Sequence, residues 1–269
     1  MHTLVNGLRA TTIDVRDRGL QYGDGLFETI VVRAGVPQLW PRHLQRLRTG
    51  CQQLRLPMPD EDVLRRETEE VAHGEALAVV KIIVTRGTSE RGYRIRPGQP
   101  GMRSVSGHPW PAHQARNAVD GITSRWCQMQ CGRQPRLAGL KHLNRLEQVL
   151  ARAEWEDDDA EGLMCDTEGE VIGGTMSNLF LVRGDVLLTP DLSQSGVAGV
   201  MRAEVLETAR HQGLEPRTVP VSRSMVESAD ELFITNAVIG IWPIRALEGK
   251  QYAVGKTTQA LQAALSGAR

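Results

Sequence analysis

The segment "LAGLKHLNRLEQ", residues 137–148, places one lysine at the junction of a glycine-containing loop and an expected helix. Leu140 and Leu143 flank Lys141, and a lysine amine in apolar surroundings is a usable nucleophile. The alternative is an amine that reaches solvent along its aliphatic stem, and spacing alone favours that alternative. The choice matters because 28 of the 32 basic residues are arginine, so only four side chains can form an imine.

Three other segments have similar ambiguity. "YGDGLFET", residues 22–29, resembles a phosphate loop but lacks the third glycine and precedes a strand, so a tight turn fits better. In "HLQRL", residues 43–47, Arg46 either binds an anion through two hydrogen bonds or is a surface charge. "AGVMRAEVL", residues 198–206, places a glycine before a helix whose first amides could hold a phosphate. No segment decides the function alone.

The composition argues against several classes of function. Hydrophobic residues make up 41% and charged residues 24% of the 269 residues, as in a soluble globular protein. The formal net charge is zero, whereas a nucleic-acid-binding protein usually has a basic excess. The longest apolar stretch is interrupted by Lys81 and is too short to span a membrane, and the N-terminus lacks a signal-peptide pattern. We therefore expect a cytoplasmic protein that binds neither nucleic acid nor membrane.

The four cysteines and seven histidines are dispersed along the chain. Cys127 and Cys131 are close in sequence, but no second pair has zinc-type spacing. We expect buried free thiols and no metal site.

Strand and helix patterns follow one another without a fixed repeat, which indicates an α+β or mixed α/β fold. The turns "NG" and "AG" predict two hairpins near the N-terminus. A helix is expected over residues 144–155, and the apolar run 231–247 is expected to form one strand. A Pro-, His- and Ala-rich segment, residues 111–120, is expected to link a smaller α+β domain, residues 1–110, to a larger cofactor-binding domain, residues 121–269.

Six segments together give a stronger signal than any one of them. "DRGLQYGDGLFET", "HLQRL", "LAGLKHLNRLEQVLARAEW", "SNLFLV", "AGVMR" and "ADELFITNA" occur in the order found in the class IV aminotransferase family, which the chain resembles nearly end to end. These are the fold-type IV pyridoxal phosphate enzymes, which include branched-chain aminotransferases, D-amino-acid aminotransferases and 4-amino-4-deoxychorismate lyases. "KHLNRLEQVL" and "ITNA" are most similar to the lyase branch, which cleaves 4-amino-4-deoxychorismate to p-aminobenzoate and pyruvate, a step towards folate. The resemblance implies a two-domain, D-amino-acid-aminotransferase-like fold and a homodimer.

The resemblance also implies which residues hold the cofactor, pyridoxal 5'-phosphate. It makes Lys141 the residue that binds the cofactor covalently. The residues implied at the phosphate are Arg46, the amides of Val200 and Met201, Thr235 and Ala237. A helix N-terminus, an arginine and a hydroxyl are the usual parts of a phosphate site, so the physical interpretation agrees.

Three residues are implied to act on the substrate. Arg91, in the loop "TSERGY", and Asn236 match positions that bind the substrate in the lyase branch, and chorismate-type substrates carry two carboxylates. Thr29 matches a threonine that assists proton delivery, where an aminotransferase more often has glycine. The resemblance thus favours a carbon–oxygen lyase over a D- or branched-chain amino-acid aminotransferase or a non-catalytic relative.

Gly173 departs from the family pattern. Family members carry a glutamate five residues before the asparagine of "SNLF", and its carboxylate keeps the pyridine nitrogen protonated; here that position, counted from Asn178, is Gly173. Three explanations compete: a weakened electron sink, another donor or a water in the space, or cofactor binding without turnover. We expect lyase activity to survive in reduced form, because aromatisation of the product drives the reaction. Gly173→Glu is then expected to raise kcat by about tenfold or more, since ring protonation stabilises the carbanion.

Overall fold

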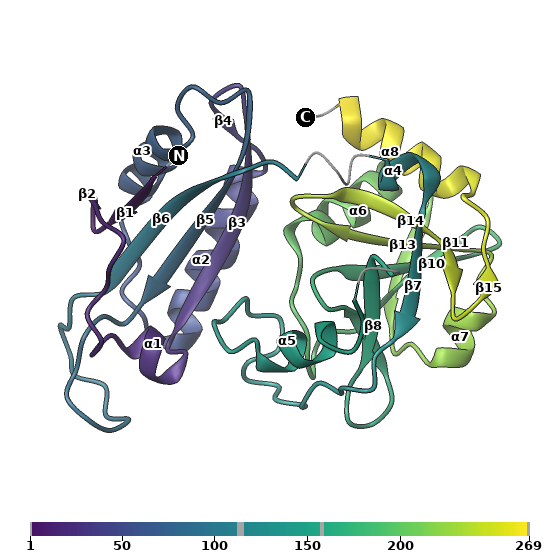
Figure 1. Ribbon diagram of the computed structural model, residues 1–269. Helices are drawn as coiled ribbons and strands as arrows, with labels where there is room; N and C mark the ends of the chain where they lie inside the picture. Colours follow the sequence, from purple (N-terminus) through teal and green to yellow (C-terminus); the bar gives the residue numbers. More distant parts are fainter. Residues whose placement is uncertain (1, 112–115, 157–158, 268–269) are drawn as a thin grey trace. The chain divides into compact units, whose positions relative to one another are not determined.

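The fold combines helices with one antiparallel sheet and one mixed sheet, and agrees with the expected α+β class (Figure 1). Part of the expected linker, residues 112–115, lies outside the described residues. The computed structural model describes residues 2–111, 116–156 and 159–267.

The chain divides into two compact units, and one short segment does not follow the sequence order. Residues Leu140–Asn144, which include Lys141, group with the first unit although they lie between two stretches of the second. The first unit is Met1–Pro111 with Leu140–Asn144, and the second is Ala112–Gly139 with Arg145–Arg269.

The first unit is built on a sheet whose described strands run in the order β2-β1-β6-β5-β3-β4. Helix α2 packs on β3, and α3 packs on β1, β4 and β6 (Figure 1). The elements are β1 (Thr3–Val5), β2 (Leu8–Arg9), α1 (Arg18–Tyr22), β3 (Gly25–Arg33), β4 (Val36–Pro37), α2 (Trp40–Leu54), α3 (Glu61–Val71), β5 (Leu77–Thr85) and β6 (Met102–Pro109).

Strand register assigns the side chains of this sheet to two faces. Glu28 pairs with Ile82 and Ile82 pairs with Val105, so these three side chains share one face. Thr29 pairs with Lys81, and both project from the opposite face. The strand β3 therefore presents different chemistry to its two sides.

Both predicted N-terminal hairpins are confirmed. The turn residues Asn6 and Gly7 have φ of 49° and 86°, and Ala34 and Gly35 have φ of 47° and 80°. Two successive positive φ values are typical of the type I′ turn, whose twist matches that of the flanking strands.

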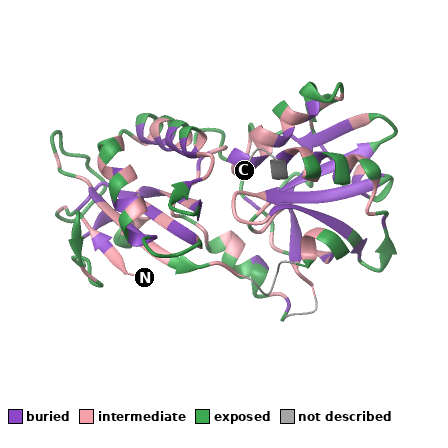
Figure 2. Cartoon of the chain, turned by 90° about the horizontal axis from the view of Figure 1, so that it is seen from above, coloured by how far each residue is buried: buried purple, intermediate pink, exposed green. Residues whose placement is uncertain are grey.

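The second unit contains a sheet whose described strands run β12-β11-β10-β13-β14-β7-β8-β9, with β15 paired to β14. Helix α6 packs on β12 and β13, α8 packs on β13 and β14, and α5 packs on β8. Figure 2 shows that the buried residues lie mainly along the strands. The elements are α4 (Asn117–Asp120), β7 (Ile122–Trp126), α5 (Leu146–Arg152), β8 (Glu161–Cys165), β9 (Val171–Gly174), β10 (Asn178–Arg183), β11 (Val186–Pro190), α6 (Val200–His211), β12 (Glu215–Val219), α7 (Arg223–Glu227), β13 (Glu231–Asn236), β14 (Gly240–Leu247), β15 (Lys250–Gln251) and α8 (Lys256–Gly267).

The prediction of one strand over residues 231–247 is wrong. The segment forms an antiparallel hairpin, β13–β14, because Asn236 Oδ1 accepts hydrogen bonds from Val238 N at 2.8 Å and Ile239 N at 3.0 Å. A side-chain oxygen that binds the backbone two residues ahead is an Asx turn. The uninterrupted apolar pattern concealed it, because both strands are buried.

Candidate active site

Glu28 of β3 fixes the Arg46 guanidinium in the first unit. Arg46 Nε donates to Glu28 Oε1 at 2.8 Å, and Arg46 Nη2 donates to Glu28 Oε2. The His43 ring lies 2.6 Å from the same carboxylate through Nδ1. Burial raises the pKa of Glu28, but the charge and hydrogen bonds of Arg46, with the hydrogen bond from His43, lower it to about 2. Arg46 is therefore an oriented cation and not a mobile surface charge.

The opposite face of β3 gathers two lysine amines around one aromatic ring. Lys141 Nζ lies 4.2 Å from the centroid of the Phe27 ring, and Lys81 Nζ lies 5.2 Å from it. Thr29 projects from the same face as Phe27, two residues along the strand. Sequence reasoning did not assign Lys81 a role. Its charge within an apolar run was a signal, but only the strand register places it opposite Thr29.

Backbone pairing carries Lys141 to β3. Phe27 N donates to the Lys141 carbonyl at 3.0 Å, and Leu143 N donates to the Gly25 carbonyl at 3.0 Å. A Cβ on Gly25 would lie 2.7 Å from Leu143 Cδ1, so glycine lets the lysine segment approach this closely. Gly23, with φ of 66°, ends α1 and forms the tight turn expected from "YGDG".

Arg91 lies in the long loop between β5 and β6 and is exposed. The loop residues on either side of it contact α1, which is the only helix of the described residues before β3. The predicted residues of the first unit thus comprise the Lys141–Thr29 face of the sheet, the Arg46 pair on the other face, and Arg91 in this loop.

The start of α6, in the second unit, carries the two amides predicted to bind the phosphate. Val200 and Met201 begin the helix, and Gly199 precedes them without a side-chain cap. A Cβ on Gly199 would overlap Asn178 Oδ1, while Asn178 Nδ2 donates to the Val197 carbonyl at 2.9 Å. The first amides of a helix point outwards and favour an anion. Asn178, which sequence analysis used only as a reference position, shapes the loop that leads to them.

The loop before α6 also pairs with the chain that leads to the lysine. Gly139 N donates to the Gly196 carbonyl at 3.0 Å, and Ala198 N donates to the Gly139 carbonyl at 3.0 Å. Gly139 is two residues from Lys141 in sequence. The two motifs that sequence analysis treated as separate are therefore hydrogen-bonded through their flanking residues.

The β13–β14 turn limits what Thr235 and Asn236 can do. Thr235 Oγ1 is fully buried and donates to the Gly240 carbonyl at 2.6 Å. Asn236 Nδ2 donates to the Met176 carbonyl at 3.1 Å, and its Oδ1 forms the turn. The Thr235 hydroxyl proton is thus used within the protein and is not available to a phosphate.

Gly173 has a backbone conformation that a side chain would strain. Its φ is 146°, and a Cβ there would lie 2.6 Å from the Ser177 carbonyl oxygen. Residues 173–177 must therefore shift to accept Gly173→Glu. The structure adds a steric cost to the substitution that the sequence alone presented as a simple restoration.

The neighbouring Gly174 makes room for a buried carboxylate. A Cβ on Gly174 would lie 2.6 Å from Glu161 Cδ. Glu161 is fully buried and accepts hydrogen bonds from Thr175 Oγ1 at 2.5 Å, Thr175 N at 3.0 Å and Ser177 Oγ at 2.7 Å. Burial raises the pKa of Glu161, and the hydrogen bonds from Thr175 and Ser177 offset only part of that effect. Gly173 thus supplies a backbone conformation that favours glycine, whereas Gly174 leaves space for the Glu161 carboxylate.

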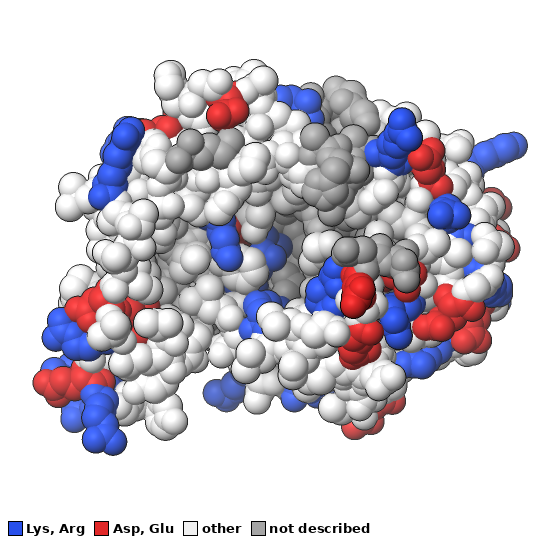
Figure 3. All heavy atoms as spheres, viewed as in Figure 1, with Lys and Arg blue, Asp and Glu red and all other residues white. Residues whose placement is uncertain are grey.

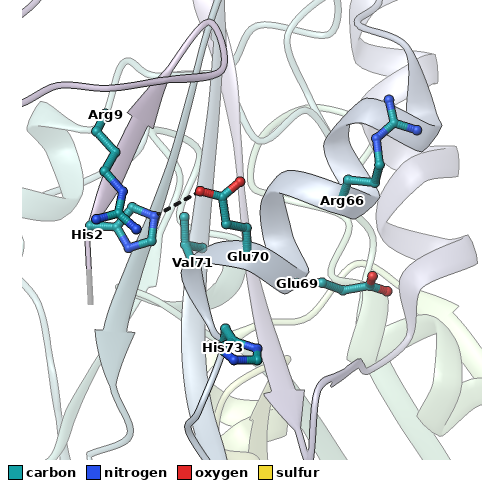
Figure 4. Close-up of a pocket in the computed structure, with 7 residues that line it drawn as sticks. All are labelled: His2, Arg9, Arg66, Glu69, Glu70, Val71 and His73. Atoms are coloured by element: carbon teal, nitrogen blue, oxygen red, sulfur yellow. Dashed lines mark hydrogen bonds and ion pairs between the residues drawn. The ribbon is translucent and has the colours of Figure 1, made fainter.

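A surface pocket of about 490 Å³ in the first unit has mixed charge and involves none of these residues. Figure 4 shows the His2 ring directed towards Glu70, with a His2 Nε2–Glu70 Oε1 distance of 3.4 Å. On the face shown in Figure 3, acidic and basic side chains likewise lie close together in several places. The pocket is lined by His2, Arg9, Arg66, Glu69, Glu70, Val71 and His73.

The described residues, 2–111, 116–156 and 159–267, bear on two other classes of site. Among them, no helix combines the length and the apolar character needed to cross a membrane. The same residues contain no group of three or more His, Cys, Asp or Glu side chains arranged to hold a metal ion. All four cysteines are buried free thiols.

The sequence profile described as "Amino-transferase class IV" matches residues 25–247, and the chain belongs to this family. Aminodeoxychorismate lyase of Vibrio harveyi is 34% identical over 97% of this chain and 98% of that protein. The crystal structure of 4-amino-4-deoxychorismate lyase from Pseudomonas aeruginosa is 48% identical, with a TM-score of 0.94 over 98% of both chains. D-alanine aminotransferase of Bacillus licheniformis is 25% identical over 94% of this chain and 90% of that protein. The predicted family and two-domain fold are confirmed.

Proposed function

We propose that this chain is a pyridoxal 5'-phosphate-dependent 4-amino-4-deoxychorismate lyase, which releases p-aminobenzoate and pyruvate in folate biosynthesis. The observation that carries the proposal is the Lys141 amine beside Phe27, on the sheet face that also bears Thr29. The similarity to two lyases over almost the whole chain supports the same substrate. The aminotransferase relative is less similar.

Residues in each unit suit groups of the cofactor. In the second unit, Gly199 adds neither a Cβ nor a side-chain cap at the start of α6, which suits a phosphate. In the first unit, Glu28 fixes the direction of the Arg46 guanidinium, which we propose as a phosphate ligand, and Lys141, on the other face of β3, supplies the amine. When bound, the cofactor withdraws electrons from the substrate carbon that bears nitrogen.

Lys141 and Thr29 are proposed to move the protons. The Lys141 amine, displaced by the substrate amine, takes the proton from the carbon bearing nitrogen. The carbon–oxygen bond to the pyruvyl group then breaks, and the ring becomes aromatic. Thr29 and Lys141 return one proton to the methylene carbon of the leaving enol, which gives pyruvate. One amine thus acts as base and then as acid.

Three groups are proposed to bind the two substrate carboxylates. Arg91 and Lys81 supply positive charge, and Lys81 projects from the same sheet face as Thr29. Asn236 keeps one Nδ2 hydrogen beyond its bond to the Met176 carbonyl. This assignment adds Lys81 to the two residues that the family pattern implies.

Gly173 favours a lyase over an aminotransferase. A transaminase depends on a strong electron sink, which the missing carboxylate would support. In the lyase reaction, formation of the aromatic ring supplies driving force that transamination lacks. We therefore propose lyase turnover that is lower than that of an enzyme with glutamate at this position.

Pyruvate release from 4-amino-4-deoxychorismate, measured with a coupled assay, tests the proposal. Lys141→Ala is expected to lower kcat by at least about 10³-fold, because it removes the covalent partner and the base. The wild-type protein should show a cofactor absorbance band above about 400 nm that borohydride removes, and Lys141→Ala should lack it.

The matched control is Lys256→Ala, which removes an exposed amine at the start of α8 and should keep both activity and band. Wild-type protein that transfers amino groups between amino and keto acids, but releases no pyruvate, would support the aminotransferase alternative. A band that persists in Lys141→Ala contradicts the assignment of the lysine.

We also propose a cytoplasmic homodimer. Helix α5 exposes Leu146, Val149 and Leu150 by 75%, 59% and 55%, and their spacing places them along one side of the helix. A contiguous apolar surface of this kind favours contact with a second copy of the chain. Light scattering should give twice the 29.7 kDa chain mass, and Leu150→Glu should shift the protein towards monomer. A monomeric wild type would contradict the proposal.

A further inference from the structure

Arg18 of α1 is a buried cation whose guanidinium contacts a distant loop. The residue is 3% exposed, and its Nη1 donates to the Gly92 carbonyl at 2.8 Å and to Ser89 Oγ at 3.1 Å. Its Nη2 lies 3.5 Å from the Tyr93 carbonyl. Arg18 therefore binds the loop 89–93 at three residues.

Asp24 anchors the other side of the Arg18 guanidinium. Arg18 Nε donates to Asp24 Oδ2 at 2.8 Å, and Arg86 donates to both oxygens of the same carboxylate, at 2.7 and 2.9 Å. Burial raises the pKa of Asp24, but the hydrogen bonds and charges of Arg86 and Arg18 lower it overall. Arg18 thus binds the ionised Asp24 through Nε and binds the loop through its other guanidinium nitrogens.

Tyr22, on the same helix, adds a second attachment. Gly92 N donates to Tyr22 Oη at 3.3 Å, and the Tyr22 and Tyr93 rings meet edge to face with centroids 5.3 Å apart. The Arg18 guanidinium lies 4.9 Å from the Tyr22 ring centroid. Arg91 is the exposed residue between these attachment points.

We propose that Arg18 is a positioning residue that fixes the loop 89–93 and thereby aims Arg91 at a carboxylate of the substrate. The inference rests on the proposed function, because it takes Arg91 as a substrate ligand. Arg18 touches neither substrate nor cofactor in this assignment; it acts through the loop. A flexible arginine must lose conformational freedom on binding, so a loop that is ordered beforehand lowers that cost.

Arg18→Lys tests the proposal, because one ammonium group cannot bond Asp24 and three loop residues together. KM should rise by about tenfold or more while kcat changes by less than about threefold, since the loop acts on binding. Trypsin should cleave after Arg91 at least about fivefold faster, because cleavage follows local opening.

Arg86→Lys is the matched control. Arg86 is also buried and shares Asp24, but its other donors bind the Leu54 and Arg55 carbonyls at the end of α2. It should leave KM within about twofold of the wild type and cleavage after Arg91 unchanged. An equal rise in KM in this control would overturn the proposal in favour of general destabilisation.

A double-mutant cycle separates positioning from independent effects. If Arg18 acts through Arg91, the variant R18K/R91A should have the same KM as R91A alone. If the two substitutions instead raise KM by the product of their separate effects, the inference is overturned.

Should Arg18→Lys fail to fold, Tyr22→Phe is the second test. This variant removes only the acceptor of Gly92 N and should speed cleavage after Arg91 by about twofold. An unchanged cleavage rate in that variant also overturns the inference. If the wild type releases no pyruvate, the proposed function fails, while the cleavage rates still decide whether Arg18 fixes the loop.

Discussion

Two fully buried glutamates, one in each unit, respond to burial in opposite ways. Glu28 in the first unit faces Arg46 and His43, and these partners lower its pKa to about 2 despite burial. Glu161 in the second unit accepts hydrogen bonds from neutral donors of Thr175, Ser177 and the backbone, and burial raises its pKa. The difference lies in the partners, because both carboxylates are hydrogen-bonded and inaccessible.

The comparison shows that the two units position their functional groups by different means. In the first unit, ion pairs orient long side chains, as Glu28 orients Arg46 and Asp24 orients Arg18. In the second unit, glycines and neutral hydrogen bonds shape the backbone around Glu161 and Asn178. Charge changes should therefore disturb the first unit, and added atoms should disturb the second.

Glu28→Gln should give the largest effect. The variant leaves Arg46 without its charged partner, and breaking a buried pair in this way should cost about 3 kcal/mol of unfolding free energy at pH 7. The lowering of the Glu28 pKa from 4.5 to about 2 corresponds to a similar value, roughly 3 kcal/mol. Urea unfolding measures this loss, and a titration of the cofactor should show weaker binding in the variant.

Glu61→Gln is the control for Glu28→Gln. Glu61 pairs with Arg48 at a partly exposed position, so its loss should cost less than about 1 kcal/mol. Equal losses in the two variants would show that burial does not strengthen the Glu28 pair.

Gly173→Ala should cost about 2 kcal/mol, because it combines a disfavoured φ with a Cβ close to the Ser177 carbonyl. Gly184→Ala is the matched comparison: its φ of 54° is also positive, but a Cβ there has open space. It should cost about 1 kcal/mol. Thermal unfolding of both variants isolates the steric part, and no difference between them would mean that residues 173–177 relax freely.

Gly173→Glu carries the same steric cost, so its kcat must be measured per folded, cofactor-loaded protein. The expected rise of about tenfold follows from ring protonation. No rise in that quantity contradicts the explanation of Gly173 as a weakened electron sink.

Among the changes at Glu28, Gly173 and Glu161, Glu161→Gln should have the smallest effect at pH 7, about 1 kcal/mol. The amide loses one acceptor for the Thr175 and Ser177 donors, but it also removes the cost of burying a charge. Urea unfolding at pH 7 measures the difference. A loss as large as that of Glu28→Gln would remove the contrast between the two units.

The pH dependence of the two carboxylates has opposite sign. The folded pKa of Glu28 is lowered, so its stabilising contribution is complete above pH 4.5 and is lost as the pH falls through about 2. The folded pKa of Glu161 is raised, so its contribution is present below 4.5 and is lost as the pH rises through the folded value. Unfolding measured from pH 3 to pH 8 should lose the acid-side slope in Glu28→Gln and the slope above pH 4.5 in Glu161→Gln.

Local sequence predicted those parts of the site that depend on neighbours in the chain. The hairpin turns, the helix that begins at Val200 and the loop that carries Lys141 all follow from short-range patterns of glycine, proline and apolar residues. The Asx turn at Asn236 was missed because the apolar pattern runs on through it. Pattern alone cannot separate a buried hairpin from a longer buried strand.

The roles of Glu161 and Arg18 required contacts between distant residues. Glu161 binds Thr175, 14 residues away, and Arg18 binds Ser89, 71 residues away. In the sequence each is an ordinary charged residue, most often exposed. Strand register and loop closure decide that both are buried and paired.

By itself the sequence determined the family and the absence of a side chain at Gly173, and it predicted Lys141 as the nucleophile through the family resemblance, because residue identity and order carry that information directly. Only the tertiary structure decided that Gly173 has φ of 146° and faces the Ser177 carbonyl, that Arg46 is oriented by Glu28, and that Lys81 lies opposite Thr29. The physical reason is that burial, register and hydrogen-bond direction depend on which distant segments pack together. The same residue type therefore acts differently in the two units.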